Sequence, residues 1–150
     1  MLLLHDMKEF HQAGCVLALG TFDGVHRGHK TLLLRTVELA KKAGLPSAAL
    51  TFDRHPLALL CPEKAPRLLT TPEQKRALIE HLGIDVLVEQ PFTQQWATQT
   101  PERFLREVCR AMHPQTLVVG SNYTFGRGAM GTVETLREHS ASMGFGLDVI

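Results

Sequence analysis

The sequence predicts an α/β protein in which helices cover both faces of a mainly parallel sheet of about five strands. Short apolar segments alternate along the 150 residues with longer segments of helical periodicity. The apolar segments are too hydrophobic to face water on either side, as is typical of buried parallel strands. Helix start and stop signals separate the two kinds of segment, and successive parallel strands require right-handed crossovers. Together these observations predict a three-layer sandwich.

The first strand and helix of this pattern enclose a glycine-rich loop. Cys15–Gly20 is a run of apolar or small residues that ends on glycine, which indicates a short buried strand. From Lys30 to Ala43 the apolar residues recur at helical spacing, and Gly44 followed by Pro46 marks the end of that helix. We therefore expect a strand, a turn and a helix in direct succession.

The other elements follow in order. Thr71-Pro72 and Thr100-Pro101 each place an N-cap threonine before a proline at the first helical position, and Thr132 caps a third helix. Residues 1–14 are expected to form a lead-in segment with an edge strand at Leu2–Leu4. Further strands are expected at residues 47–52, 84–89, 116–120 and 145–150. This succession predicts a Rossmann-like architecture.

The composition limits the class of partner. A formal net charge of +1 argues against a general nucleic-acid or anionic-membrane surface, which needs a concentrated basic excess. No apolar run approaches the roughly 18 residues that span a bilayer. Cys15, Cys61 and Cys109 are odd in number and far apart, so neither a disulfide framework nor a zinc ribbon is expected. We expect a cytoplasmic protein that binds neither nucleic acid nor membrane.

The loop Thr21–His29 carries the chemistry of a phosphate site. A glycine-rich turn that opens a helix presents bare N–H groups and the positive end of the helix dipole to an anion. The loop has neither the Gly-Lys-Ser/Thr ending of a P-loop nor the Gly-x-Gly-x-x-Gly spacing. Instead His26 and His29 share a helical face and can both reach one oxyanion, and Gly28 leaves room for a phosphate. Such a pair could also bind zinc, but no third ligand is evident nearby.

A second polar segment, Gly120–Gly128, leaves the fourth main strand at the same edge of the sheet. Its two aromatic residues can stack on a flat ligand, and the amide of Asn122 can donate and accept hydrogen bonds in the ligand plane. The alternative is a glycine-rich connection whose aromatic residues pack into the core. Because ligands of open α/β sheets bind at the carboxyl ends of the strands, ligand contact is favoured.

Four segments taken together resemble one family. The spacing of His26, Gly28 and His29 is the signature of the HxGH nucleotidyltransferase superfamily, so the HxGH nucleotidyltransferase fold is expected. The order of the segments is similar to the N-terminal, FMN adenylyltransferase half of the bacterial bifunctional riboflavin kinase/FAD synthetase family. The segments are Gly20–His29, Thr51–Pro56, Arg67–Thr70 with Lys75 following, and Val119–Gly126.

The resemblance implies an FMN adenylyltransferase that makes FAD and pyrophosphate from FMN and ATP, with Mg²⁺ accompanying ATP. The FMN phosphate would attack the α-phosphorus of ATP in line, while the catalytic residues His26 and His29 donate hydrogen bonds to phosphate oxygens. The implied ATP-binding residues are Gly20, Thr21, Phe22, Asp23, Gly24 and Gly28. The implied flavin-binding residues are His55, Asn122, Tyr123, Thr124, Phe125 and Arg127. Metal ligands stay unassigned, and Asp23 either orders the loop or aids Mg²⁺.

The chain departs from the family pattern in places. Thr21 stands where asparagine is frequent, Arg54 where proline is usual, and Ser121 where an acidic residue is common. A second phosphate motif of the type Ile-Ser-Ser-Thr-x-x-Arg does not occur within the 150 residues. Residues 15–150 are therefore expected to be a nucleotidyltransferase domain without its C-terminal end or any riboflavin kinase domain, although a parent chain could carry that kinase domain fused to it.

Two alternative functions stay open on the sequence. The first is another HxGH transferase, of the glycerol-phosphate cytidylyltransferase or pantetheine-phosphate adenylyltransferase type. The second is a non-catalytic module that binds a flavin or a nucleotide. Both would use the same loop, so the loop alone does not separate them from FMN adenylyl transfer.

Overall fold

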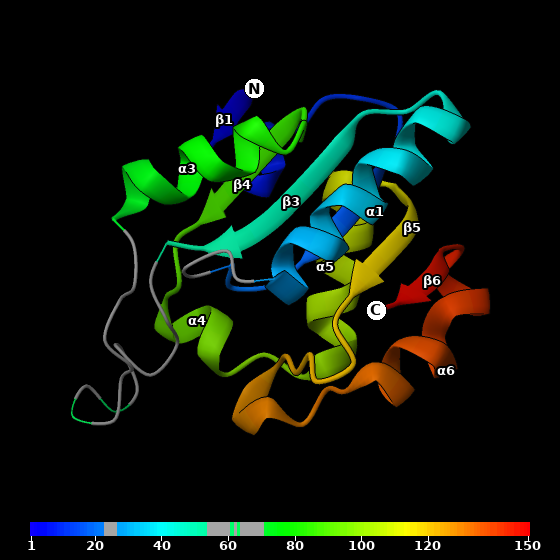
Figure 1. The fold of residues 1–150 in the computed structure, drawn as a ribbon. Coiled ribbons are helices and arrows are strands. Elements are labelled where there is room, and N and C mark those ends of the chain that lie inside the picture. The colour runs from blue at the N-terminus through cyan, green and yellow to red at the C-terminus, as the bar shows by residue number, and fades with distance from the viewer. Residues whose placement is uncertain (23–26, 54–60, 62, 64–70) are drawn as a thin grey trace.

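The computed structural model describes residues 1–22, 27–53, 61, 63 and 71–150. These residues form a parallel sheet of six strands: β1 (Leu2–Leu4), β2 (Cys15–Leu19), β3 (Ser47–Phe52), β4 (Val86–Gln90), β5 (Pro114–Val119) and β6 (Gly146–Val149). Their order across the sheet is β1-β4-β3-β2-β5-β6, and every neighbouring pair runs parallel (Figure 1). The predicted parallel α/β sheet is confirmed.

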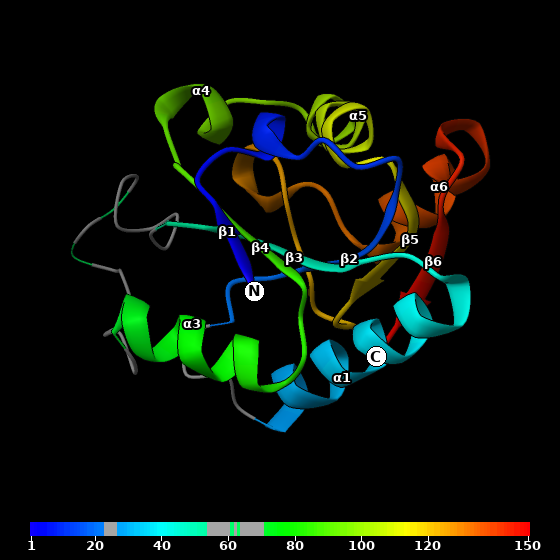
Figure 2. The same cartoon turned by 90° about the horizontal axis from the view of Figure 1, so that it is seen from above.

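Helices cover both faces of this sheet, so the predicted three layers are present (Figure 2). The helices α1 (Arg27–Ala43) and α3 (Pro72–His81) lie on one face. On the other face lie α4 (Gln94–Ala97), α5 (Pro101–Met112) and α6 (Val133–Met143). In the described part of the chain, no helix has the length and apolar character needed to cross a membrane.

The central strand β2 contributes to a separate hydrophobic core on each face. Successive side chains of a strand point to opposite faces of the sheet. Val16 and Ala18 therefore pack with the apolar residues of α1 and α3, while Leu17 and Leu19 pack with those of α5. All four are at most 1% exposed, which explains why the strand is apolar throughout rather than alternating.

The order of the strands creates a switch point beside β2. From β2 the chain moves outward through β3 and β4, and then returns to place β5 on the other side of β2. The chain continues from β2 to α1 on one face of the sheet and from β5 to α6 on the other face. Ligands of open α/β sheets bind in the crevice that such a divergence leaves.

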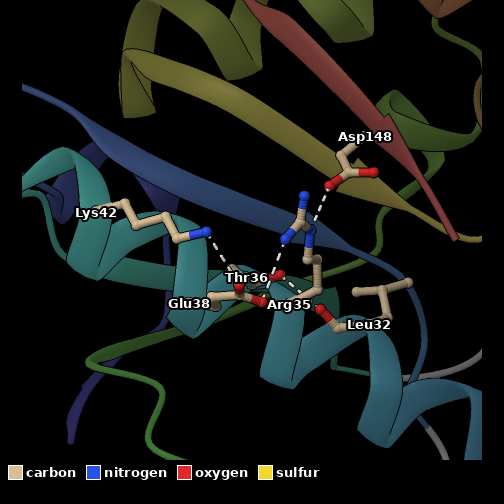
Figure 3. A network of polar contacts seen from close by, with 6 residues as sticks. All are labelled: Leu32, Arg35, Thr36, Glu38, Lys42 and Asp148. Atoms are coloured by element: carbon tan, nitrogen blue, oxygen red, sulfur yellow. Dashed lines mark hydrogen bonds and ion pairs between the residues drawn. The ribbon is translucent and has the colours of Figure 1, made fainter.

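The helix α1 is tied to the far edge of the sheet by a polar network (Figure 3). The Nε of Arg35 donates to Asp148 of β6 at 2.8 Å, and its guanidinium also pairs with Glu38 at 3.2 Å. Lys42 extends the network to Glu38 at 3.1 Å. Hydrogen bonds to Asp148 and then to Glu38 raise the pKa of the Arg35 guanidinium. This network helps to hold α1 against its face of the sheet, on the side of β6.

The observed elements extend the prediction at three points. The helix α1 begins at Arg27 rather than at Lys30, so Gly28 and His29 lie in its first turn. The expected edge strand β1 pairs with β4 and brings the sheet to six strands. The short helix α4 was not expected, because four residues are too few to show helical periodicity.

Candidate active site

Two cavities adjoin each other at the carboxyl edge of the sheet. One of about 490 Å³, here named the loop cavity, lies between the loops that follow β2 and β5. The other, of about 390 Å³, is named the aromatic cavity. Both are lined by Gly20, Thr21, Tyr123 and Thr124, so the two cavities share a wall. Ligands bound in the two cavities would therefore meet at that wall.

The N-terminus of α1 lies at the loop cavity. Gly28 and His29, which lie in the first turn of this helix, line the cavity. The first N–H groups of a helix have no intrahelical acceptor, and the helix dipole is positive at this end. The first turn of α1 contains no acidic residue that would offset this positive potential. The arrangement is therefore suited to bind an anion.

Phe22 shapes the loop that follows β2. Its φ of +54° lies in the left-handed region, which costs a residue other than glycine about 1–3 kcal/mol and persists only where the surroundings over-determine it. The Phe22 ring is fully buried and meets the ring of His29 edge-on, with centroids 5.5 Å apart. A Cβ atom on Gly20 would lie 2.9 Å from that same ring. Phe22 therefore lines the loop cavity while its buried ring packs against the ring of His29.

Aromatic residues from four separate segments wall the aromatic cavity. Phe52 ends β3, Phe92 follows β4, Trp96 lies in α4 and Phe104 lies in α5. The rings of Phe52 and Phe92 meet edge-on at 4.8 Å, and those of Trp96 and Phe104 meet at 5.8 Å. The carboxylate of Asp53 accepts a hydrogen bond from the Phe92 N–H at 3.1 Å, which ties the ends of β3 and β4 together. The cavity is therefore a preformed slot for a flat, largely apolar group.

The loop after β5 supplies the remaining wall of the aromatic cavity. The rings of Tyr123 and Phe125 stack with centroids 5.6 Å apart and an interplanar angle of 19°. Burial raises the pKa of the Tyr123 hydroxyl, so this group stays neutral near pH 7. Phe125 also contacts Phe104 at 5.4 Å between centroids, which joins the loop to α5.

The turn that follows Phe125 is fixed against the start of α5. Gly126 has a φ of +78°, and a Cβ atom there would lie 2.9–3.0 Å from atoms of Pro101. The N–H of Arg127 donates to the Gln99 carbonyl at 2.7 Å. Only glycine satisfies both the left-handed backbone and this close approach without strain.

Several of the residues predicted to bind ATP come together at the loop cavity. Besides His29, those that line it are Gly20, Thr21, Phe22 and Gly28. The other members of the predicted phosphate loop, which are Asp23, Gly24 and His26, lie outside the described residues.

The residues predicted to bind the flavin divide between the two cavities. Tyr123, Thr124 and Phe125 line the aromatic cavity, whereas Asn122 lines the loop cavity. Arg127 is exposed and lines neither of them. His55 lies outside the described residues.

Sequence reasoning missed most of the aromatic wall. Phe52 carried a usable signal, because it is the last residue of a strand at the edge where ligands bind. Phe92 lies in the loop after β4 and Trp96 in the short helix α4, and neither segment contains a recognisable motif. Phe104 belongs to the apolar face of α5, so the sequence indicates only a core residue there.

The comparison with protein families identifies the family of this chain. The FAD synthetase family model matches residues 8–150. The chain belongs to the FAD synthetase family. It is 33% identical to the bifunctional riboflavin kinase/FMN adenylyltransferase of Escherichia coli strain K12. This alignment of 147 residues covers 97% of this chain and 46% of the relative. It is 35% identical over 124 residues to the FAD synthetase of Listeria monocytogenes serovar 1/2a strain EGD-e, covering 82% and 50%. The chain thus spans about half the length of these curated relatives.

Solved structures share the fold of this member of the FAD synthetase family. A crystal structure described as a macrolide-efflux protein from Streptococcus pneumoniae aligns with a TM-score of 0.84 at 25% identity, covering 99% of this chain and 50% of that one. Pantothenate synthetase from Thermus thermophilus aligns with a TM-score of 0.67 at 17% identity, covering 100% and 60%. These likenesses confirm the predicted nucleotidyltransferase-type α/β fold.

Proposed function

We propose that the chain catalyses FMN adenylyl transfer, in which the adenylyl group of ATP passes to the phosphate of FMN and pyrophosphate leaves. One observation carries this proposal: a cavity at a helix N-terminus and an aromatic cavity share a wall. The reaction joins a nucleoside triphosphate to a flavin phosphate, so its two substrates must meet where their sites adjoin. Membership of the FAD synthetase family supports the same activity.

In this proposal the triphosphate of ATP occupies the loop cavity. The first N–H groups of α1 and the positive end of its dipole face the phosphates. His29 donates a hydrogen bond to a phosphate oxygen, and Gly28 lets the phosphates approach the backbone. Asp23, Gly24 and His26 belong to the same loop and would complete the phosphate site.

The ion Mg²⁺ would arrive on ATP. Within the described ranges, no three His, Cys, Asp or Glu side chains converge on a point that could hold a metal. Mg²⁺ is usually held by substrate phosphates, by one or two carboxylates and by several waters, instead of by a cage made wholly of protein groups. The loop cavity fits that mode of binding, and the bound ion would neutralise phosphate charge.

The isoalloxazine ring of FMN occupies the aromatic cavity under this proposal. A flat, tricyclic ring would gain stacked and edge-on contacts with Phe52, Trp96 and Tyr123. The phosphate of FMN would then lie at the shared wall beside Thr21 and Thr124. This orientation brings the attacking phosphate next to the triphosphate.

The proposed chemistry asks the protein mainly to hold the reactants and to stabilise charge. An oxygen of the FMN phosphate forms a bond to the α-phosphorus of ATP. The bond from that phosphorus to the oxygen bridging to the β-phosphate breaks, and pyrophosphate leaves with the electron pair. The attacking oxygen is already ionised near pH 7, so no general base is required. His29 and His26 would donate hydrogen bonds that strengthen as negative charge grows on the leaving group.

The test is to supply ATP and FMN and to measure FAD and pyrophosphate. We expect His29→Ala to lower FAD formation by about 10²-fold, the scale of removing one preorganised hydrogen-bond donor. His81→Ala is the matched control, because His81 is exposed at the end of α3 and lines neither cavity. Parental turnover in His29→Ala would contradict the catalytic role of this histidine.

The same assay separates the alternative functions. Turnover with glycerol phosphate and CTP, or with phosphopantetheine and ATP, in place of FMN would favour another HxGH transferase. Binding of FMN without release of pyrophosphate would favour a non-catalytic module. The aromatic walls favour FMN, because neither of the smaller acceptors has a ring system to fill a cavity of about 390 Å³.

A further inference from the structure

The carbonyl of Thr21 is held by two donors that come from distant parts of the chain. The hydroxyl of Thr51, in β3, donates to it at 3.0 Å. The ammonium group of Lys75, in α3, donates to it at 3.0 Å from the other helix on that face of the sheet. A carbonyl oxygen has two lone pairs, so these two donors use both of them. The peptide that follows Thr21 is thereby clamped between β3 and α3.

This clamp acts directly before the strained turn at Phe22. A left-handed residue other than glycine keeps its conformation only where neighbouring contacts enforce it. The buried Phe22 ring supplies one such contact and packs against the ring of His29. The Thr21 carbonyl supplies the other, because its direction sets the path of the chain into Phe22. Thr21 also lines the wall that the loop cavity and the aromatic cavity share.

Lys75 extends from a helix whose position is itself fixed. The start of α3 is closed by a reciprocal capping box, in which the Thr71 N–H donates to the Gln74 side chain at 3.0 Å and the Gln74 N–H donates to the Thr71 hydroxyl at 3.1 Å. The next residue, Arg76, pairs at 2.7 Å with Glu89 of β4, which is only 6% exposed. The half-buried Lys75 side chain therefore reaches Thr21 from a helix that is capped at its start and paired to β4.

We propose that Lys75 is a positioning residue for adenylyl transfer. Its hydrogen bond to the Thr21 carbonyl holds the turn at Phe22, and through that turn it holds His29 beside the shared wall. This inference rests on the proposed function, because it assigns a residue to the same reaction. Lys75 acts through the loop and not by touching the reacting phosphates.

The first test replaces Lys75 in the intact protein and separates turnover from flavin binding. We expect Lys75→Met, which keeps most of the apolar stem, to lower kcat by at least about 10-fold. The dissociation constant of FMN, read from the fluorescence of Trp96, should stay within about two-fold, because most of the aromatic wall is untouched. Lys75→Arg should recover kcat to within about three-fold of the parent, because a guanidinium also donates to a carbonyl. Lys41→Met, at an exposed position near the end of α1, is the control and should keep parental kcat.

A double-mutant cycle tests the route through Thr21. Thr51→Val removes the other donor to the same carbonyl with little change of shape, and Thr51→Ser keeps the hydroxyl as its control. Groups that act on one shared partner give coupled effects, whereas independent groups give multiplicative ones. We expect the loss of kcat in the double variant to differ at least about three-fold from the product of the two single losses. A purely multiplicative result would overturn the route through the Thr21 carbonyl.

The remaining outcomes distinguish this inference from the proposed function. If the parent makes FAD and Lys75→Met has parental kcat, Lys75 is not a positioning residue and the proposed function stands. If Lys75→Met loses thermal stability and FMN affinity together with kcat, and Lys75→Arg does not recover kcat, the role is general folding and the inference fails. If the parent binds FMN but releases no pyrophosphate from ATP, the proposed function itself fails and the inference fails with it.

Discussion

At the scale of single residues, two glycines hold backbone conformations that other residues adopt less readily, one at the end of α1 and one at the site. Gly44 and Gly126 both have a positive φ, of +68° and +78°. A Cβ atom on Gly44 would meet no atom within 4 Å, whereas one on Gly126 would lie 2.9–3.0 Å from Pro101. Gly126, whose ψ of −179° lies outside the αL region, therefore combines an unfavourable backbone with a close contact.

Alanine substitution at these two glycines should lower the free energy of unfolding by unequal amounts. We expect Gly44→Ala to lower the free energy of unfolding by about 1–2 kcal/mol, from the left-handed backbone alone. Gly126→Ala should cost more, because two of the nearest atoms belong to the Pro101 backbone and cannot rotate away. Gly126→Ala should also weaken FMN binding, because Gly126 lines the aromatic cavity. Urea unfolding and FMN titration measure the two effects, and equal values for both variants would contradict the contact argument.

Single residues also differ in how well the sequence revealed them. The place of Gly28 and His29 at the start of a helix could be predicted from their spacing after a strand, and their role in phosphate binding stays a prediction. The role of Phe22 could not, since its buried ring and its left-handed φ depend on contacts with Gly20 and His29 in the folded loop. The sequence offered Lys75 only as a residue that follows one of the family-like segments. Its hydrogen bond to Thr21 could not be predicted, because the two residues are 54 positions apart.

At the scale of elements, the threonine-proline pairs predict the starts of helices correctly, because helix capping involves only residues that are close in the sequence. Thr71 and Thr100 both serve as N-caps, each with a proline in the first helical turn. The Thr100 hydroxyl accepts a hydrogen bond from the Arg103 N–H at 3.2 Å. Because α5 carries Phe104, this cap also secures one wall of the aromatic cavity.

Removal of the cap on α5 should therefore reduce stability. We expect Thr100→Ala to lower the free energy of unfolding by about 1 kcal/mol, since a backbone N–H loses its acceptor. Thr100→Ser keeps a hydroxyl at the same place and should stay close to the parent. The change should appear as a shifted midpoint of urea denaturation with an unchanged m-value. A stability equal to that of the parent in Thr100→Ala would show that the cap contributes nothing.

At the scale of the whole molecule, the site follows from the order of the strands. The loop cavity lies at the ends of β2 and β5, which are neighbours in the sheet but lead to helices on opposite faces. The aromatic cavity collects rings from β3, from α4 and α5, and from the loops that follow β4 and β5. Each cavity is therefore lined by segments that lie far apart in the sequence.

Binding of FMN across so many elements should stabilise the whole fold. A ligand that binds only the folded state raises the free energy of unfolding by about 2.7 kcal/mol when its concentration is 100 times its dissociation constant. We expect this rise with FMN, together with quenching of the single tryptophan, Trp96, which lines the cavity. Trp96→Phe should keep most of the stabilisation and lose the fluorescence signal. An unfolding midpoint that saturating FMN does not move would exclude the aromatic cavity as the FMN site.

The sequence by itself determined the α/β class, most of the helices and strands and the place of Gly28 and His29 at the start of α1, because periodicity, capping and motif spacing are properties of neighbouring residues. Only the tertiary structure decided the strand order, the shared wall of the two cavities, the aromatic lining and the clamp on Thr21. These features join residues such as Phe52 and Phe104, or Thr21 and Lys75, that meet only after the chain has crossed the sheet. Their contacts depend on strand order and packing, which local patterns do not encode.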